Sequence, residues 1–327
     1  MTEALRRCWA AAFMVFAVAF GATSPAHALC ITPDCRYSLI VPFAAGGTTD
    51  IIARVLGESL SNQFNVQVIV ENRPGIGGIL GAQAVAQAKP DGRTLLMLDA
   101  SAAINTTLYA RSGFDLVRDI APVASVASVP SVLVVNPSLP ASTVAELVAY
   151  AKANPGKVII GSAGAGTASQ LSGLLFKDMT GVDIVQVPYK GAGPAVQDVL
   201  AGQAQMSFVP VASAIASIRA GRLRALAVTG ATRSVALPEV PPLADFIPGY
   251  EAGGWIGIGA PKGTPTNIID GINKQINTAL VDPTVKERLA RYGASIRTDS
   301  PADFGRLITN DTQKWAKVIK ANNIKAE

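Results

Sequence analysis

The sequence has almost no histidine and little charge. Of its 327 residues one is His and three are Cys, and 16% are charged against 49% that are hydrophobic. Imidazole is the base of Ser-His-Asp and Cys-His catalysis and a common zinc ligand, so the sequence disfavours these chemistries. The apolar fraction excludes a disordered chain, and the length suffices for about two domains. The composition therefore predicts a folded protein without an evident catalytic group.

The N-terminus has the pattern of a secretory signal peptide. Two arginines are followed by an almost wholly apolar run from Trp9 to Phe20, and then by a small-residue Ala-His-Ala site at 26–28. The run is shorter than the roughly 20 residues that a membrane span needs. We therefore expect residues 1–28 to be removed on export. This leaves 299 residues with a net charge of +4, without the only His and without Cys8.

Two cysteines remain close to the new N-terminus. Cys30 and Cys35 bracket Ile-Thr-Pro-Asp, where a turn would bring them together, and an exported chain favours a small disulfide loop. The alternative is a lipidated Cys30 that anchors the protein to a membrane, but Leu29 is not the small residue expected before such a cysteine. Basic residues form no block, so we expect no nucleic-acid partner. No metal or cofactor is expected.

Apolar runs alternate with amphipathic stretches along the chain, which is typical of an α/β fold. Strands are predicted at 37–43, 66–70, 94–98, 132–135, 158–160, 184–187, 205–208, 225–228 and 255–260. Helices are predicted at 49–62, 77–88, 142–153, 169–179, 194–200 and 213–220, and in a 266–320 tail broken at Pro283 and Pro301.

The apolar stretch from Val123 to Val135 contains Pro130 and several serines, which favour a strand that crosses between two domains over a membrane span. A return near 253–258 would make the first lobe discontinuous. The lobes would then be 29–129 plus 252–327, and 130–251. Two consecutive domains are the alternative, and periodicity does not separate the two arrangements.

Four times a predicted strand ends in a glycine-rich turn that opens a helix, at 42–50, 73–78, 161–167 and 189–194. Backbone N–H groups and the positive end of the helix dipole converge at such turns and bind anions. None completes G-x-G-x-x-G, a Walker motif or G-x-S-x-G. The turns therefore predict anion recognition rather than an enzyme. A secreted hydrolase or transferase with Ser162 or Lys190 as nucleophile is a rival hypothesis.

The same residues resemble a known family. The matching segments are VPFAAGGTTDIIAR (41–54), VIVENRPGIGGILGAQAVA (68–86), PDGRTLLM (90–97), VLVVNPSLP (132–140), GSAGAGT (161–167), VPYKGAGPAVQDVLAGQ (187–203), LRALAVTGATRSVALPEVP (223–241) and GAPKGTP (259–265). In this order they resemble the Bug-type extracytoplasmic solute receptors of tripartite tricarboxylate transporters, over nearly the whole chain after the leader.

The resemblance implies an α/β, two-lobed periplasmic binding protein fold of type II. Each lobe would be a mixed, mostly parallel sheet flanked by helices, with two crossing strands between the lobes. It also implies a periplasmic monomer that binds a small carboxylate, a dicarboxylate or related organic acid rather than an amino acid, partly through bridging waters. The receptor would deliver this ligand to membrane permease subunits of a tripartite tricarboxylate-type transporter. Docking on a sensor protein is the alternative. Carried over by position, the ligand-binding residues would be Phe43, Ala45, Gly46, Gly47, Asp50, Ser101, Ser162, Ala163, Gly164, Gly166, Thr167, Tyr189, Lys190, Gly191 and Pro210.

Some positions depart from the family or have two interpretations. Val209 and Pro210 stand where many relatives have an acid and an amide, which implies a ligand without an ammonium group there. Gln170 replaces a frequent histidine, and the segment 99–104 is one residue shorter than usual. Asp50 is expected to cap the helix rather than touch the ligand.

Three further side chains have competing roles. Lys190 is either a ligand contact or solvated, and Trp255 is expected at the hinge or in the core rather than as a stacking platform. Phe43 could cover the ligand's carbon skeleton.

Overall fold

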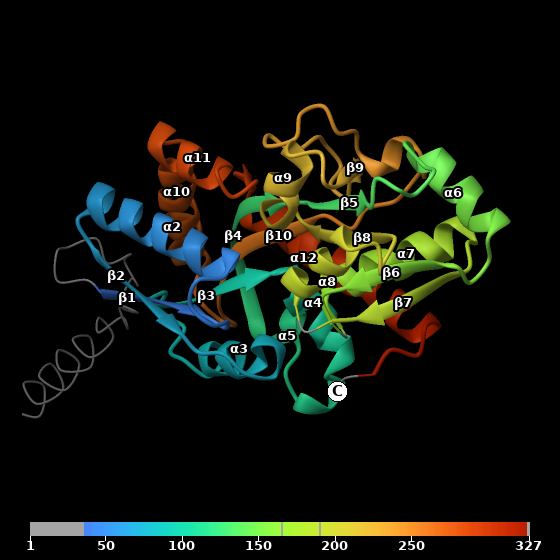
Figure 1. Ribbon diagram of the computed structural model, residues 1–327. Helices are drawn as coiled ribbons and strands as arrows, with labels where there is room; N and C mark the ends of the chain where they lie inside the picture. The colour runs from blue at the N-terminus through green and yellow to red at the C-terminus, as the bar shows by residue number, and fades with distance from the viewer. Residues whose placement is uncertain (1–35, 165, 190, 326–327) are drawn as a thin grey trace, which may run out of the picture.

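The computed structural model describes residues 36–164, 166–189 and 191–325. The predicted leader, Cys30, Cys35 and Lys190 lie outside these ranges, so the cleavage site, the disulfide and the lysine contact stay predictions. The described chain forms two lobes, each built on one β-sheet with helices packed against it (Figure 1). The predicted α/β, two-lobed fold is confirmed.

The sheet of the first lobe has the strand order β11-β4-β10-β3-β1-β2. Its first four strands in the sequence run in one direction, and the two late ones run in the other. The strands are β1 (Arg36–Val41), β2 (Gln67–Asn72), β3 (Thr94–Asp99), β4 (Ile120–Val129), β10 (Gly254–Pro261) and β11 (Ser295–Ile296). The helices are α2 (Thr48–Phe64), α3 (Ile79–Ala86), α4 (Ala100–Leu108), α5 (Leu116–Asp119), α10 (Thr266–Leu280), α11 (Pro283–Ala290) and α12 (Pro301–Ala321), with short 3₁₀ turns at Ile76–Gly78 and Ala110–Ser112.

The sheet of the second lobe has the order β7-β6-β8-β5-β9, in which only β5 runs against the others. Its strands are β5 (Ser131–Val135), β6 (Val158–Ser162), β7 (Ile184–Pro188), β8 (Met206–Pro210) and β9 (Arg224–Val228). Its helices are α6 (Val144–Ala153), α7 (Ala168–Thr180), α8 (Ala192–Leu200) and α9 (Val211–Arg219), and a 3₁₀ turn spans Leu243–Asp245.

Local sequence explains how β1 and α2 form. Successive side chains of a strand point to opposite faces, so Leu39 joins the core beneath α2 while Ile40 joins the core on the other face. α2 buries Ile52 and Leu56, which are four residues apart and share one side of the helix. The helix ends where Asn65 adopts a left-handed conformation with φ of 51°.

The chain passes between the sheets in two adjacent segments. β4 ends at Val129 in the first sheet, and β5 begins at Ser131 in the second after Pro130 alone. On the return, the Ala252 N–H donates to the Thr229 carbonyl, and Gly254 then pairs with Val129. The backbones approach closely there, because a Cβ on Gly253 would lie 3.3 Å from Gly230 Cα. The predicted pair of crossing strands is confirmed.

Helix α12 packs over this crossing and contacts both lobes through α4 and α7. Its buried Asp311 accepts a 2.7 Å hydrogen bond from the Trp255 indole nitrogen on β10. The Trp255 ring also meets Phe304 edge-on, at 5.4 Å between centroids. Trp255 is therefore a packing residue of the crossing, as expected from the sequence.

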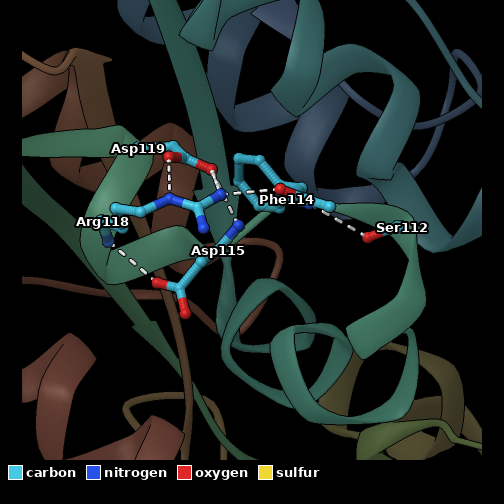
Figure 2. Close-up of polar contacts among 6 residues, drawn as sticks. Ser112, Phe114, Asp115, Arg118 and Asp119 are labelled. Atoms are coloured by element: carbon cyan, nitrogen blue, oxygen red, sulfur yellow. Dashed lines mark hydrogen bonds and ion pairs between the residues drawn. The ribbon is translucent and has the colours of Figure 1, made fainter.

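A polar cluster fixes the short helix α5 at the start of β4 (Figure 2). The Asp119 carboxylate accepts from Arg118 Nε at 2.6 Å and from the Asp115 N–H at 2.8 Å, while Arg118 also donates to the Gly113 carbonyl. The Arg118 bond, together with the arginine's charge, lowers the pKa of Asp119 although burial opposes it. Because the arginine is largely exposed, the pair adds little stability and serves to orient the turn.

Candidate functional site

The first glycine-rich turn joins β1 to α2 and exposes Ala45, Gly46 and Gly47. Gly46 has a φ of 87°, a region that glycine enters without strain. Gly47 is the N-cap residue of α2, and within the described chain this helix start has no side-chain cap. Because the first N–H groups of a helix lack partners inside it, this helix start is open to an anion.

Asp50 holds that turn in place. Its carboxylate, 2% exposed, accepts from the Gly46 N–H at 2.9 Å, from Asn72 Nδ2 at 2.9 Å and from Arg54 Nε at 3.0 Å. Burial pushes the pKa of Asp50 upward, but the bonds from Arg54, Gly46 and Asn72 and the charge of Arg54 outweigh it, so the pKa is lowered. Both oxygens are engaged. In this structure Asp50 therefore shapes the turn by binding the Gly46 N–H, one residue before the N-cap, and leaves the start of α2 itself uncapped.

Beside this turn the first lobe has a small hollow of about 10 Å³, which is room for roughly one water. Phe43, Asp99, Ser101 and Asn105 are among its lining residues. Asp99 ends β3 and caps α4: it accepts from the Ser101 N–H at 2.9 Å and from the Ser101 and Thr49 hydroxyls. Two predicted residues, Phe43 and Ser101, therefore line one hollow.

The turn after β6 satisfies much of its own backbone. The Ala163 N–H donates to the Ser169 hydroxyl at 3.2 Å, and the Gly166 N–H donates to Gln170 Oε1 at 2.7 Å. Thr167 caps α7 by accepting from the Gln170 N–H at 3.3 Å. A ligand that used the Ala163 or Gly166 N–H groups would have to displace these side chains. In contrast, the Gly164 N–H of the same turn donates to no side chain among the described residues.

Ser162, another predicted contact, has a fully buried side chain. Its hydroxyl lies 3.5 Å from the Val187 carbonyl, and its own carbonyl accepts from the Tyr189 N–H at 2.9 Å. In this structure the residue ties the third turn to the fourth. Its place in the binding wall stays a prediction.

The fourth turn opens α8 and offers a second uncapped helix start. Gly191 is the N-cap, with a φ of 120° and no side-chain cap within the described chain. The Gly191 N–H donates to the Ala163 carbonyl at 3.1 Å, which joins this turn to the third one. The Tyr189 hydroxyl donates to Asp198 at 2.6 Å. This bond, burial and the charge of Asp198 raise the pKa of Tyr189.

The two lobes touch beside these turns. A Cβ on Gly166 would lie 2.3 Å from Leu108 Cδ2 on α4, so the α7 turn of the second lobe rests on the first lobe. A second approach joins Gly293 to Val211, where a Cβ on the glycine would lie 3.3 Å from the valine Cβ. Pro210, the last predicted contact, is half-buried at the end of β8, while neighbouring Val209 is fully buried.

Sequence reasoning found the uncapped helix starts at Gly47 and Gly191, and that of α3 at Gly78 after the second turn, but it missed the polar residues around the site. Asn72, Asp99 and Gln170 all bond to a turn or a helix start at the site, and none was predicted as a site residue. A signal for Gln170 was present, since Thr167 and Gln170 have the T-x-x-Q spacing of a capping box.

The described residues contain no group of three or more His, Cys, Asp or Glu that could hold a metal ion. Within the same residues, no helix has both the length and the apolar character that crossing a membrane requires.

Two lobes joined by paired crossings, with an uncapped helix start from each lobe, define a periplasmic binding protein. The chain belongs to the tripartite tricarboxylate transporter receptor family, whose model matches residues 52–324. It is similar to Protein BugT of Bordetella pertussis, with 38% identity over 90% of this chain and 91% of that protein.

Two solved structures extend the comparison. R. palustris Rpa4515 with adipate has 35% identity and a TM-score of 0.74, covering 89% of this chain and 98% of that one. MatC from Rhodopseudomonas palustris with bound malate has 29% identity and a TM-score of 0.70, covering 87% and 98%. The matched family is one of transporter receptors.

Proposed function

We propose that this protein is a periplasmic receptor that binds a small dicarboxylate between its lobes and delivers it to a tripartite tricarboxylate-type permease. The observation that carries the proposal is the pair of uncapped helix starts at Gly47 and Gly191, one on each lobe. Each offers backbone N–H groups and a positive dipole end to one carboxylate. Relatives with adipate and malate support a ligand with two carboxylates.

Closure would bring the two helix starts onto one ligand. We propose that residues 29–129 and 252–327 move as one lobe and 130–251 as the other, about the paired crossings at 129–131 and 252–254. A ligand shifts this equilibrium only through its greater affinity for the closed state. The apolar pair Val209 and Pro210 supports a ligand without an ammonium group at that point.

Calorimetric titration of the mature protein tests the proposal. The panel contains adipate, malate, a neutral sugar, an amino acid and a simple cation. Binding of at least one dicarboxylate, and of neither sugar nor cation, is the expected result. Binding of sugars or cations without any carboxylate would refute the proposed function.

Gly166→Ala tests whether the contact between Gly166 and Leu108 belongs to the closed receptor. Alanine at a φ of 70° costs about 1 to 2 kcal/mol, and its Cβ would force either the Leu108 side chain to shift or the lobes to separate. We expect dicarboxylate affinity to fall about tenfold, equivalent to about 1.4 kcal/mol.

Gly181→Ala is the matched control, because Gly181 ends the same helix with a φ of 67° and has nothing within 4 Å of an added Cβ. It should lose similar stability and keep wild-type affinity. Equal affinities of the two variants would show that closure does not use the Leu108 contact.

A further inference from the structure

Asp99 is an acid beside the start of α2, where the proposed function places an anion, because the hydroxyl of Thr49 on that helix donates to it. It is partly buried at the junction of β3 and α4 and lines the hollow next to Phe43 and Ser101. A fixed negative charge there would repel a carboxylate, because like charges disfavour each other's ionised form at short range. Receptor function and this side chain are therefore in conflict unless the charge is neutralised.

The described surroundings of Asp99 provide no counter-ion. Its three hydrogen bonds come from the Ser101 N–H, the Ser101 hydroxyl and the Thr49 hydroxyl, all neutral donors. On α2 the nearest charged groups in the sequence, Asp50 and Arg54, pair with each other at 3.0 Å.

The described residues that line the hollow offer no cation either. Asp99 is the sole titratable residue among those that line the hollow, and Tyr189 of the second lobe donates to Asp198. Lys190 lies outside the described residues. Because none of these described groups supplies a positive charge, protonation is the means of neutralising Asp99.

Burial raises the pKa of Asp99, although the bonds from Ser101 and Thr49 partly offset it. An anion beside the carboxyl would raise that pKa again, since the ionised form would then face a like charge. At a pH between the pKa of Asp99 in the free protein and its higher pKa in the complex, ligand binding must be accompanied by the uptake of a proton. Below that window Asp99 is already protonated, and above it Asp99 stays ionised and binding is weaker.

We propose that Asp99 takes up one proton from solvent when a dicarboxylate binds, and then faces the ligand as a neutral hydrogen-bonding group. This inference rests on the proposed function. The proton has a place on Oδ2, to which Thr49 alone donates, whereas Oδ1 accepts both bonds from Ser101. The receptor would thereby discriminate against ligands that carry an ammonium group, which would require the ionised acid.

The experiment counts protons during calorimetric titration with adipate and with malate. Titrations in buffers of different ionisation enthalpy, between about pH 4 and pH 8, give the number of protons taken up per ligand bound. Where one proton is taken up, linkage requires the affinity to fall up to about tenfold for each unit by which the pH rises. Asp99→Asn keeps a residue that caps α4 about as well as aspartate does, and it replaces the ionisable carboxyl group with an amide that does not titrate. The control is Asp282→Asn, a change at the N-cap of α11 on another part of the first lobe.

The proposal expects proton uptake by the wild type and by Asp282→Asn. In Asp99→Asn, uptake should fall by the amount due to Asp99, leaving only the ligand's own protonation. This variant should also bind at neutral pH at least as tightly as the wild type, with a flatter pH profile.

Dicarboxylate binding without proton uptake, or uptake that Asp99→Asn retains in full, overturns the proposal and leaves the receptor function intact. Tighter binding of L-aspartate than of malate, lost in Asp99→Asn, also overturns it, because Asp99 would then act as an ionised partner of an ammonium group. If no carboxylate binds the wild type, the proposed function fails and this inference fails with it.

Discussion

Asp311→Ala is expected to lower the free energy of unfolding by about 3 to 5 kcal/mol, the range for breaking a buried charged pair by removing one partner. Asp311 is 4% exposed, and its carboxylate accepts from the Trp255 indole at 2.7 Å and from Lys314 Nζ at 2.5 Å. The variant would leave a buried indole N–H and a largely covered ammonium without this acceptor. Urea unfolding followed by tryptophan fluorescence measures the change.

Two variants separate the buried contact from a general effect of removing an acid from α12. Asp311→Asn keeps an acceptor for the Trp255 N–H and loses the charge opposite Lys314, so we expect an intermediate loss. Asp303→Ala removes an exposed acid at the start of the same helix, where a surface pair contributes at most about 1 kcal/mol. Equal stability of Asp311→Ala and Asp303→Ala would contradict the structural role assigned to Asp311.

This contact also bears on lobe movement. Trp255 belongs to the return strand β10, and α12 contacts elements of both lobes. Any rotation about the crossings must therefore preserve or rearrange the packing of α12. Because the Trp255–Asp311 bond lies on the first-lobe side of the return crossing, we expect it to persist in both open and closed receptors.

The elements that the sequence predicts well are those with strong local signals. Pro283 and Pro301 both stand at the first position of a helix, where proline's fixed φ fits and its missing N–H costs nothing. Pro130 interrupts the apolar run at the point where the chain changes sheets. In each case one residue type restricts the backbone regardless of its distant neighbours.

Helix α4 was not predicted, because its residues include Asn105, Thr106 and Thr107, which favour helices only weakly. It forms against α12, a partner nearly 200 positions later in the chain, and no local pattern contains that contact. The polar contacts of the site were missed for the same reason, because they also join residues that are far apart in the sequence. Asn72 is 22 residues from Asp50, and Thr49 is 50 residues from Asp99, so a search for periodicity or motifs does not connect them.

The glycine-rich turns show what a sequence cannot predict about a binding site. The sequence alone predicted four anion-binding helix starts, because it shows the glycines and the order of strands and helices. Whether a start is open depends on side chains that reach back to it. Gln170 and Ser169 occupy N–H groups of the third turn, whereas Gly47 and Gly191 leave α2 and α8 without side-chain caps in the described chain.

Asp50→Ala is expected to weaken dicarboxylate binding by at least about tenfold and to lower the free energy of unfolding by about 1 to 3 kcal/mol, the cost of unsatisfied buried polar groups. The variant frees the Gly46 N–H, Asn72 and Arg54 together, so the turn that presents the start of α2 loses its fixed shape. Calorimetric titration and urea unfolding measure the two effects. Arg54 is half-exposed, so its ion pair accounts for little of the loss.

The pH dependence provides the sharper test of Asp50. Its pKa is lowered in the folded protein, so its stabilisation is fully present above the ordinary carboxyl value of about 4 and is lost as the pH falls through the lower folded value. The stability difference between wild type and Asp50→Ala should therefore be largest at neutral pH and shrink in acid. Asp50→Asn, which retains one acceptor oxygen, should keep more of the binding affinity than Asp50→Ala does. A difference that is constant down to about pH 2, or an alanine variant with wild-type affinity, would show that the turn holds its shape without the charged Asp50 carboxylate.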